Sequence, residues 1–133
     1  MTQKIPRLTV DAVILDREKN SIVLVKRGIY PFEGMWALPG GFVEYKETVE
    51  NATIREAKEE TGLDIEIERM VGVYSDPERD PRGHTVAVTF LCRRVGGELN
   101  AGDDAAEAKE FKIKEMPEMA FDHRKMVDDA MTL

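Results

Sequence analysis

The order of apolar and polar residues predicts strands near the start of the chain. Leu8 to Asp16 alternates between the two types, and Ser21 to Arg27 is rich in β-branched residues. Both patterns are typical of strands, and the polar segment Glu18-Lys19-Asn20 between them favours a hairpin. We therefore expect a pair of antiparallel strands here.

Three further strands are predicted later in the chain. Asp64 to Ser75 alternates, with a break expected near Met70 to Gly72, and Lys109 to Lys114 is a shorter segment. The clearest alternation runs from Thr85 to Val95. Its apolar side chains are expected on one face: Val86, Val88, Phe90 and Cys92.

Two helices are also predicted. Thr48 is a residue type that caps a helix, and Gly62 is able to end one in the left-handed conformation. The residues between them are mainly Ala, Glu, Lys and Arg, which favour helix. A second helix is expected from Phe121 to Met131. Several strands, with one helix among them and one at the end, predict an α/β sandwich rather than a doubly wound sheet.

The first predicted helix carries a cluster of carboxylates. At 3.6 residues per turn, Glu56, Glu59 and Glu60 fall within an arc of about 100°. Like charges at this spacing repel, and hard divalent cations would relieve the repulsion because they prefer oxygen ligands. The alternative is a solvated helix in which Arg55 and Lys58 neutralise their neighbours. The adjoining arc is expected to face the sheet: Ala52, Thr53, Ile54 and Ala57.

The segment before this helix favours a metal site over that alternative. Trp36 to Glu44 contains Pro39, Gly40 and Gly41. Pro39 fixes one backbone dihedral, and the glycines adopt conformations that are closed to other residues. A carbonyl of Gly40 or Gly41 is then able to point toward metal ions held by the helix. On its own, the segment would indicate only a tight turn.

Composition restricts the class of protein. With 133 residues and a net charge of −7, the chain is expected to be a single domain, residues 1–133, without general nucleic-acid binding. An anionic substrate stays compatible with this charge, since metal ions dominate the local field at a carboxylate cluster. Met1 to Val10 lacks the layout of a signal peptide, and no apolar run approaches the ~18 residues of a membrane span. We expect a cytoplasmic protein without a membrane partner, in which Cys92 is a packed core thiol.

The helix and the segment before it contain a specific motif. Its residues follow the spacing G-x5-E-x7-R-E-x-x-E-E-x-G and are Gly41, Glu47, Arg55, Glu56, Glu59, Glu60 and Gly62. This is the spacing of the Nudix box, and the chain resembles a Nudix hydrolase over Arg27 to His84. The resemblance implies a Nudix-type α/β/α sandwich with a mixed central sheet. It also implies hydrolysis of a pyrophosphate with Mg²⁺, or alternatively Mn²⁺, as cofactor.

The chemistry of pyrophosphate hydrolysis assigns roles to the motif. Bound metal ions lower the pKa of the attacking water and neutralise the phosphates. Glu56 and Glu60 are expected to be the principal metal ligands, with Glu59 sharing or supporting this role. The resemblance adds the backbone carbonyl of Gly40 as a further ligand.

Arg55 and an acidic segment complete the predicted catalytic set. Arg55 is expected to orient the carboxylates, paired either with Glu59 or with Glu47. The resemblance places a general base in a loop near the end of the sheet, where Glu107 is our first choice. Its competitors are Asp103, Asp104 and Glu110. A solvated acidic loop is the alternative for each of them.

The charged segment after the third long strand is predicted to be a loop that selects the substrate. Pro77 lies fifteen residues after Gly62, and this proline resembles the one that marks the ADP-ribose pyrophosphatase branch of the family. Arg79 and Arg82 in the same segment are candidate phosphate contacts. The alternative is a solvated hairpin connection.

Other candidate contacts lie before and after these motifs. Arg27 ends the second strand and offers a planar fork of donors to a phosphate. Tyr30, Phe32 and Trp36 either stack on a base or seal a core. His84 is either a ligand contact or a residue bonded to the backbone.

These observations lead to an expected function with two alternatives. The leading hypothesis is a Mg²⁺-dependent hydrolase that acts on a small-molecule nucleotide, ADP-ribose, and gives AMP and ribose 5-phosphate. The first alternative is a nucleoside triphosphate pyrophosphohydrolase with a house-cleaning role. The second is a non-catalytic nucleotide sensor. The sequence leaves a homodimer open.

Overall fold

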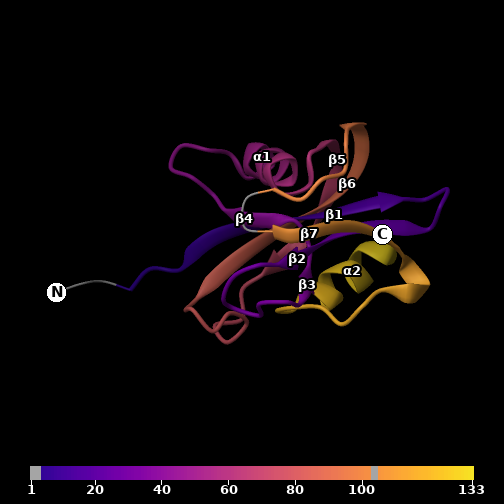
Figure 1. The fold of residues 1–133 in the computed structure, drawn as a ribbon. Helices are drawn as coiled ribbons and strands as arrows, with labels where there is room; N and C mark the ends of the chain where they lie inside the picture. The colour runs from indigo at the N-terminus through magenta and orange to yellow at the C-terminus, as the bar shows by residue number, and fades with distance from the viewer. Residues whose placement is uncertain (1–3, 103–104) are drawn as a thin grey trace.

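A mixed sheet with one helix on each face forms the structure (Figure 1). The computed structural model describes residues 4–102 and 105–133. The strands are β1 Arg7–Asp16, β2 Ser21–Arg27, β3 Trp36–Ala37, β4 Gly40–Phe42, β5 Leu63–Tyr74, β6 Thr85–Gly97 and β7 Ala105–Lys112. The helices are α1 Val49–Thr61 and α2 His123–Met131, with a short 3-10 helix at Ile113–Glu115. The predicted α/β sandwich with a mixed sheet is therefore confirmed.

The central strand β1 changes partner along one of its edges. The strand order is β3-β2-β1-β6-β5, with β4 beside β1 and β7 beside β2. β1 runs parallel to β6 on one edge. On the other edge it pairs with β2 at Leu15 and Asp16, and with β4 from Thr9 to Asp11. β2 and β4 therefore lie beside different halves of the same edge, and a cavity opens between them at the level of Asp11.

Alternation along β1 directs side chains into two cores. The even-numbered residues from Val10 to Ile14 pack with α1 and with the even-numbered face of β6. Val13 points the other way and packs against Met126 of α2. Cys92 is buried in the first core, which confirms the predicted packed thiol, and burial raises the pKa of this thiol to about 12.

The ends of α1 follow the prediction, and its buried face does so with one exception. Thr48 Oγ1 accepts a hydrogen bond from the backbone N–H of Asn51 at 3.0 Å, and Gly62 ends the helix with a φ of 76°. The buried residues of the helix are Ala52, Thr53, Ala57 and Thr61. Ile54 is 40% exposed, so the prediction that it faces the sheet is wrong. It lies about 100° around the helix beyond Thr53, past the edge of the buried arc.

Three predicted boundaries also differ from the structure. The segment before α1 contains β3 and β4 instead of being a loop throughout, because pairing with β2 and β1 outweighs its proline and glycine signals. β7 begins at Ala105 rather than at Lys109, since its pairing extends along the whole of β2, and Glu107 therefore lies on a strand. α2 begins at His123 rather than at Phe121, whose φ of 53° is left-handed.

The long hairpin of β5 and β6 agrees with the sequence pattern. The two strands pair antiparallel with several register shifts. One of these shifts lies between Met70 and Gly72, which confirms the predicted break.

Candidate active site

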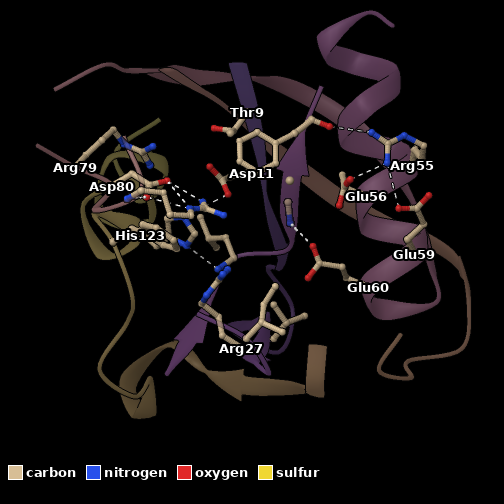
Figure 2. Close-up of a pocket in the computed structure, with 18 of the residues that line it drawn as sticks. Thr9, Asp11, Arg27, Arg55, Glu56, Glu59, Glu60, Arg79, Asp80 and His123 are labelled. Atoms are coloured by element: carbon tan, nitrogen blue, oxygen red, sulfur yellow. Dashed lines mark hydrogen bonds and ion pairs between the residues drawn. The ribbon is translucent and has the colours of Figure 1, made fainter. Parts of the chain in front are cut away.

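A cavity of about 370 Å³ opens beside α1, β1 and the start of α2 (Figure 2). Both acidic and basic side chains line it. The acidic residues are Asp11, Glu44, Glu56, Glu59, Glu60 and Asp80, and the basic residues are Arg27, Arg55, Arg79 and Arg82. The cavity thus brings the motif carboxylates together with all the arginines that the sequence predicts to contact the substrate.

Arg55 binds carboxylates from both parts of the motif. Its Nε and Nη2 donate to the two oxygens of Glu47 at 2.7 and 2.9 Å. Its Nη1 donates to Glu56 at 2.7 Å and to Glu59 at 3.1 Å, and Nη2 also donates to the carbonyl of Phe42 at 3.1 Å. The two partners that the sequence leaves open for Arg55, Glu47 and Glu59, are therefore both present. The hydrogen bonds from Arg55 lower the pKa of Glu47 to about 2.

Glu56 and Glu60 are the more buried carboxylates of α1. They lie on the same side of the helix as its buried residues, and Gly41 and Gly40 of β4 lie against them. Burial raises the pKa of Glu60 to about 8, with the charge of Glu56 adding to the rise and a hydrogen bond from the Gly40 N–H at 3.2 Å opposing it. Burial also raises the pKa of Glu56, against the opposing hydrogen bond from Arg55. A cation beside this pair would stabilise its ionised form.

The two glycines before the helix are required by close contacts. A Cβ atom on Gly41 would lie 2.5 Å from Glu56 Oε2. A Cβ atom on Gly40 would lie 2.1 Å from the carbonyl oxygen of Val10 and 2.6 Å from Asp11 Oδ1. The backbone of β4 therefore lies directly against Glu56 and against Asp11 of β1.

The donor set fits a hard divalent cation, although its members are now bonded to other groups. Carboxylate oxygens are the ligands that Mg²⁺ and Mn²⁺ prefer. Among the described residues, no group of three or more His, Cys, Asp or Glu side chains is arranged to hold a metal ion. Arg55 donates to Glu56 and Glu59, and the Gly40 N–H donates to Glu60.

Asp11 and His123 form a buried pair in the cavity that sequence reasoning missed. The backbone N–H of Leu38 donates to His123 Nδ1 at 3.0 Å, so the ring hydrogen is on Nε2. Nε2 lies 3.3 Å from Asp11 Oδ1. Burial raises the pKa of Asp11 to about 7, and burial lowers the pKa of His123 to about 3. The signal available in the sequence was a carboxylate between the apolar residues Val10 and Ala12 of a predicted strand.

Arg79 is buried and bonded, unlike a solvated loop arginine. Its Nε and Nη2 donate to the two carboxylate oxygens of Asp122 at 3.0 and 2.7 Å. Its Nη1 donates to Thr85 Oγ1 at 2.5 Å, and its side chain is 4% exposed. Burial alone would lower the pKa of Arg79, but the hydrogen bonds with Asp122 raise it. Arg79 lines the cavity while tying its loop to the start of α2.

Arg27 and Arg82 lie near the ring of Phe121 in the same cavity. The guanidinium carbons are 5.1 and 5.7 Å from the ring centroid, respectively. Arg82 pairs with the buried Asp80 at 2.8 Å and lies 5.1 Å from the ring centroid of Phe42. Arg27 Nε donates to the carbonyl of Pro31 at 2.5 Å. Both side chains therefore line the cavity, and their contact with phosphate stays a prediction.

Other predicted residues lie away from the cavity. Pro77 is exposed and is not among the lining residues. His84 Nε2 is 2.9 Å from the carbonyl oxygen of Ser75, which favours the backbone-bonded alternative. Phe32 packs edge-on against Phe121, a contact that seals a core.

The structure does not bring Glu107 to the cavity. It is exposed on β7, where its register partner is Lys26 of β2. Its competitor Glu110 accepts hydrogen bonds from Ser21 at 2.7 Å and from Lys19 at 3.2 Å. The other competitors, Asp103 and Asp104, lie outside the described residues.

Comparison with known proteins identifies the family. The model of the NUDIX domain matches residues 5–130. The chain belongs to the Nudix family. It is 52% identical over 126 residues to the ADP-ribose pyrophosphatase of Methanocaldococcus jannaschii, a match that covers 95% of this chain and 73% of that protein. It is also 31% identical to the ADPR responsive transcriptional repressor NtrR of Acinetobacter baylyi, over 94% of this chain and 53% of the repressor.

Solved structures of Nudix proteins share the fold. The NUDIX domain of Shewanella oneidensis NrtR, crystallised with ADP ribose, has a TM-score of 0.83 and 28% identity, and the match covers 98% of this chain and 89% of that chain. A bifunctional NMN adenylyltransferase/ADP ribose pyrophosphatase from Francisella tularensis, complexed with AMP and a Mn ion, has a TM-score of 0.84 and 31% identity. That match covers 99% of this chain and 43% of the other. Nudix hydrolases generally require a divalent metal, and the motif carboxylates of this chain fit that requirement.

Proposed function

We propose that this Nudix protein hydrolyses ADP-ribose to AMP and ribose 5-phosphate, with Mg²⁺ as its cofactor and Mn²⁺ as a substitute. The observation that carries the proposal is the 52% identity, over 95% of the chain, to an ADP-ribose pyrophosphatase. The cavity supports it because carboxylates for a cation and arginines for phosphates line the same space.

The residues that would hold the metal are those of α1 and the loop before it. Glu56 and Glu60 supply the principal oxygens, Glu59 a further one, and Gly40 its carbonyl. When bound, the cation supplies charge neutralisation at the diphosphate and a lower pKa of the attacking water. Arg55 keeps the carboxylates in place through its bonds to Glu56 and Glu59.

Arginines of the cavity are proposed to bind the diphosphate. Arg27 and Arg82 present guanidinium groups beside Phe121, and a guanidinium is able to pair with phosphate oxygens through two parallel hydrogen bonds. Arg79 and Pro77 shape the loop that carries Arg82. Glu107 remains the proposed general base from the sequence, and it would reach the reaction only after a rearrangement that brings it to the cavity.

A panel of substrates tests this function directly. We expect the protein to convert ADP-ribose to AMP and ribose 5-phosphate with Mg²⁺, as read by product chromatography. Excess chelator should abolish turnover, and added Mg²⁺ or Mn²⁺ should restore it. Full turnover in chelator would rule out the metal mechanism, and a preference for nucleoside triphosphates would favour the house-cleaning alternative. That alternative has a relative at 34% identity, a putative 8-oxo-dGTP diphosphatase of Bacillus subtilis.

A nucleotide sensor is the second candidate function. Its support is the likeness to a repressor described as ADPR responsive and to a NUDIX domain crystallised with ADP ribose. A sensor would bind ADP-ribose without turning it over. The metal-binding carboxylates are all present in this chain, which favours the enzyme.

The cellular location and the oligomeric state of the protein are also matters of proposal. None of the described helices is long and apolar enough to cross a membrane. We propose a cytoplasmic protein, and fractionation of cells that produce it would test this. The homodimer that the sequence leaves open is tested by light scattering of the purified chain.

A further inference from the structure

We propose that Asp11 is a specificity residue that accepts a hydrogen bond from a ribose hydroxyl of the ligand. This inference rests on the proposed function, since it concerns the sugar of the same substrate. Asp11 lies outside the Nudix motif, on β1, where it is the register partner of Gly40 on β4. Its side chain lines the cavity although the residue is only 6% exposed.

His123 fixes the orientation of this carboxylate. The Leu38 N–H occupies His123 Nδ1, so Nε2 carries the hydrogen and presents it 3.3 Å from Asp11 Oδ1. Arg79 holds Asp122, the residue immediately before His123, through two hydrogen bonds. Asp11 is therefore held from the α2 side, and Figure 2 shows its carboxylate between His123 and the Glu56–Glu60 side of the cavity.

The distance from Asp11 to the motif carboxylates points to the ribose. A Cβ atom on Gly40 would lie 2.6 Å from Asp11 Oδ1, and the N–H of the same glycine donates to Glu60 at 3.2 Å. The backbone of one residue thus separates Asp11 from a proposed metal ligand. A ligand group that contacts Asp11 must then be separated from the diphosphate by only a few covalent bonds. Ribose is esterified directly to phosphate, whereas adenine lies beyond the ribose.

The oxygens of Asp11 favour a ligand group that donates a hydrogen bond. A carboxylate repels a phosphate, and the cations proposed for phosphate, Arg27 and Arg82, lie beside Phe121. Oδ1 faces the hydrogen of His123 Nε2, which leaves Oδ2 for a group of the ligand. Neutral hydroxyls are the remaining partners near a diphosphate, and carboxylates bind ribose hydroxyls in dinucleotide-binding proteins.

The variant Asp11→Asn separates this role from folding. The Asn carbonyl oxygen is still able to face His123, while the other position becomes an amide that donates instead of accepting. We would measure kcat/KM for ADP-ribose and for analogues that lack the 2′-hydroxyl of one ribose or the other, in wild type and in Asp11→Asn. Deleting the bound hydroxyl should lower kcat/KM of wild type roughly 10- to 100-fold, and it should lower kcat/KM of the variant less than about twofold. The ratio of kcat/KM for ADP-ribose to kcat/KM for the analogue is measured within one protein, so a lower folded fraction cancels.

Two further variants and one further substrate complete the test. Asp128→Asn makes the same chemical change on the exposed side of α2, outside the cavity, and should keep the wild-type ratio. His123→Asn keeps an acceptor for the Leu38 N–H, but its shorter side chain no longer brings a donor to the position of Nε2 beside Asp11, and it should reduce the ratio. An analogue with inosine in place of adenosine tests whether Asp11 binds the base amino group instead. If Asp11→Asn changes the effect of inosine on kcat/KM, Asp11 binds the base and the proposal is overturned.

The failure of this inference is distinguishable from that of the proposed function. If wild type hydrolyses ADP-ribose but deletion of either ribose hydroxyl changes kcat/KM by less than twofold, the role of Asp11 is wrong and the enzyme stands. If wild type binds ADP-ribose without turnover, the same comparison is made with dissociation constants from calorimetry. If wild type neither binds nor hydrolyses ADP-ribose, both proposals are wrong.

Discussion

Burial of Glu60 disfavours its ionised form, whereas the proposed role as a metal ligand requires that form. Its carboxylate is largely buried and its pKa is raised to about 8 by burial. Glu60→Gln keeps the size of the side chain and an acceptor for the Gly40 N–H, but it weakens a metal ligand. We expect kcat to fall ~10²-fold or more, about 2.7 kcal/mol of transition-state stabilisation. At pH 8 the variant should be at least as stable as wild type, because it buries no charge.

The control for this variant is Glu50→Gln. Glu50 is an exposed residue in the first turn of the same helix and does not line the cavity. It should leave kcat unchanged in a steady-state assay with saturating Mg²⁺. If Glu60→Gln stays within twofold of wild type, Glu60 is not a principal ligand.

Gly40 and Gly41 are expected to respond differently to alanine. At Gly41 the new Cβ meets the end of a flexible side chain, Glu56, which is able to move away at the expense of the metal site. At Gly40 it meets the backbone carbonyl of Val10, which cannot yield without shifting a central strand. Gly41→Ala should therefore lose activity with little change in melting temperature, whereas Gly40→Ala should lower the melting temperature by several degrees. Calorimetry with an activity assay checks both, and equal melting temperatures would contradict the steric account.

Residue types and spacing predict the motif carboxylates and the arginines of the cavity, and they do not predict the pair of Asp11 and His123. Glu56, Glu59 and Glu60 are close in sequence, so helix geometry alone places them together. Asp11 and His123 meet only because β1 and the start of α2 pack in the folded chain. An isolated aspartate and an isolated histidine carry no spacing that would pair them.

At the scale of elements, long alternating strands are predictable and short paired strands are not. The ranges of β1, β5 and β6 follow from alternation and that of β2 from its β-branched residues, although β1, β2 and β6 are largely buried on both faces. β3 and β4 are too short for a period and lie on either side of Pro39, and their pairing with β2 and β1 depends on the rest of the sheet. The first half of β7 is also hidden, because its three alanines and Glu107 show no strand pattern and pairing with β2 makes them a strand.

The loop between β5 and β6 is the element expected to set substrate preference. Arg82 reaches the cavity from this loop, held by Asp80 and placed near Phe42 and Phe121. Arg82→Ala should reduce kcat/KM for ADP-ribose by roughly 10- to 150-fold, the range for loss of a charge-assisted contact. A nucleoside triphosphate should be affected less if the loop contacts the terminal-ribose end.

The control for the loop is Arg124→Ala, an exposed arginine on α2 that pairs with Asp128 outside the cavity. This variant should leave kcat/KM unchanged for both substrates. Equal losses on both substrates in Arg82→Ala would show that the loop acts through stability or general electrostatics. The ADP-ribose preference would then have no support from Arg82.

Across the whole molecule, the cavity depends on the path of the sheet. β1 exchanges β2 for β4 along one edge, and this exchange opens the space that Asp11 lines. Strand order is a property of long-range pairing, and local sequence patterns do not determine it. The family resemblance anticipated the mixed sheet; the residues alone predict only the strands and helices that compose it.

Buried carboxylates of the cavity should make stability depend on both pH and metal. The pKa of Glu60 is raised from 4.5 to about 8, so the folded state retains a proton that the unfolded state releases, and stability falls as pH rises through this range. Asp11, raised from 3.8 to about 7, acts in the same direction. The pKa of His123 is lowered from 6.5 to about 3, so this residue makes stability rise with pH between these values. Above about pH 6.5 its contribution to stability no longer changes with pH.

The window from pH 6.5 to 8 therefore isolates the carboxylates. In chelator, we expect the free energy of unfolding to fall by about 1 to 2 kcal/mol across this window, a decrease in melting temperature on the order of 5 °C. Mg²⁺ binds the ionised form, so it should raise the melting temperature more at pH 8 than at pH 6.5. Calorimetric scans of wild type and Glu60→Gln measure this, and the variant should show a flatter pH dependence. An identical pH slope in the two proteins would mean that Glu60 does not titrate in the folded state near neutral pH.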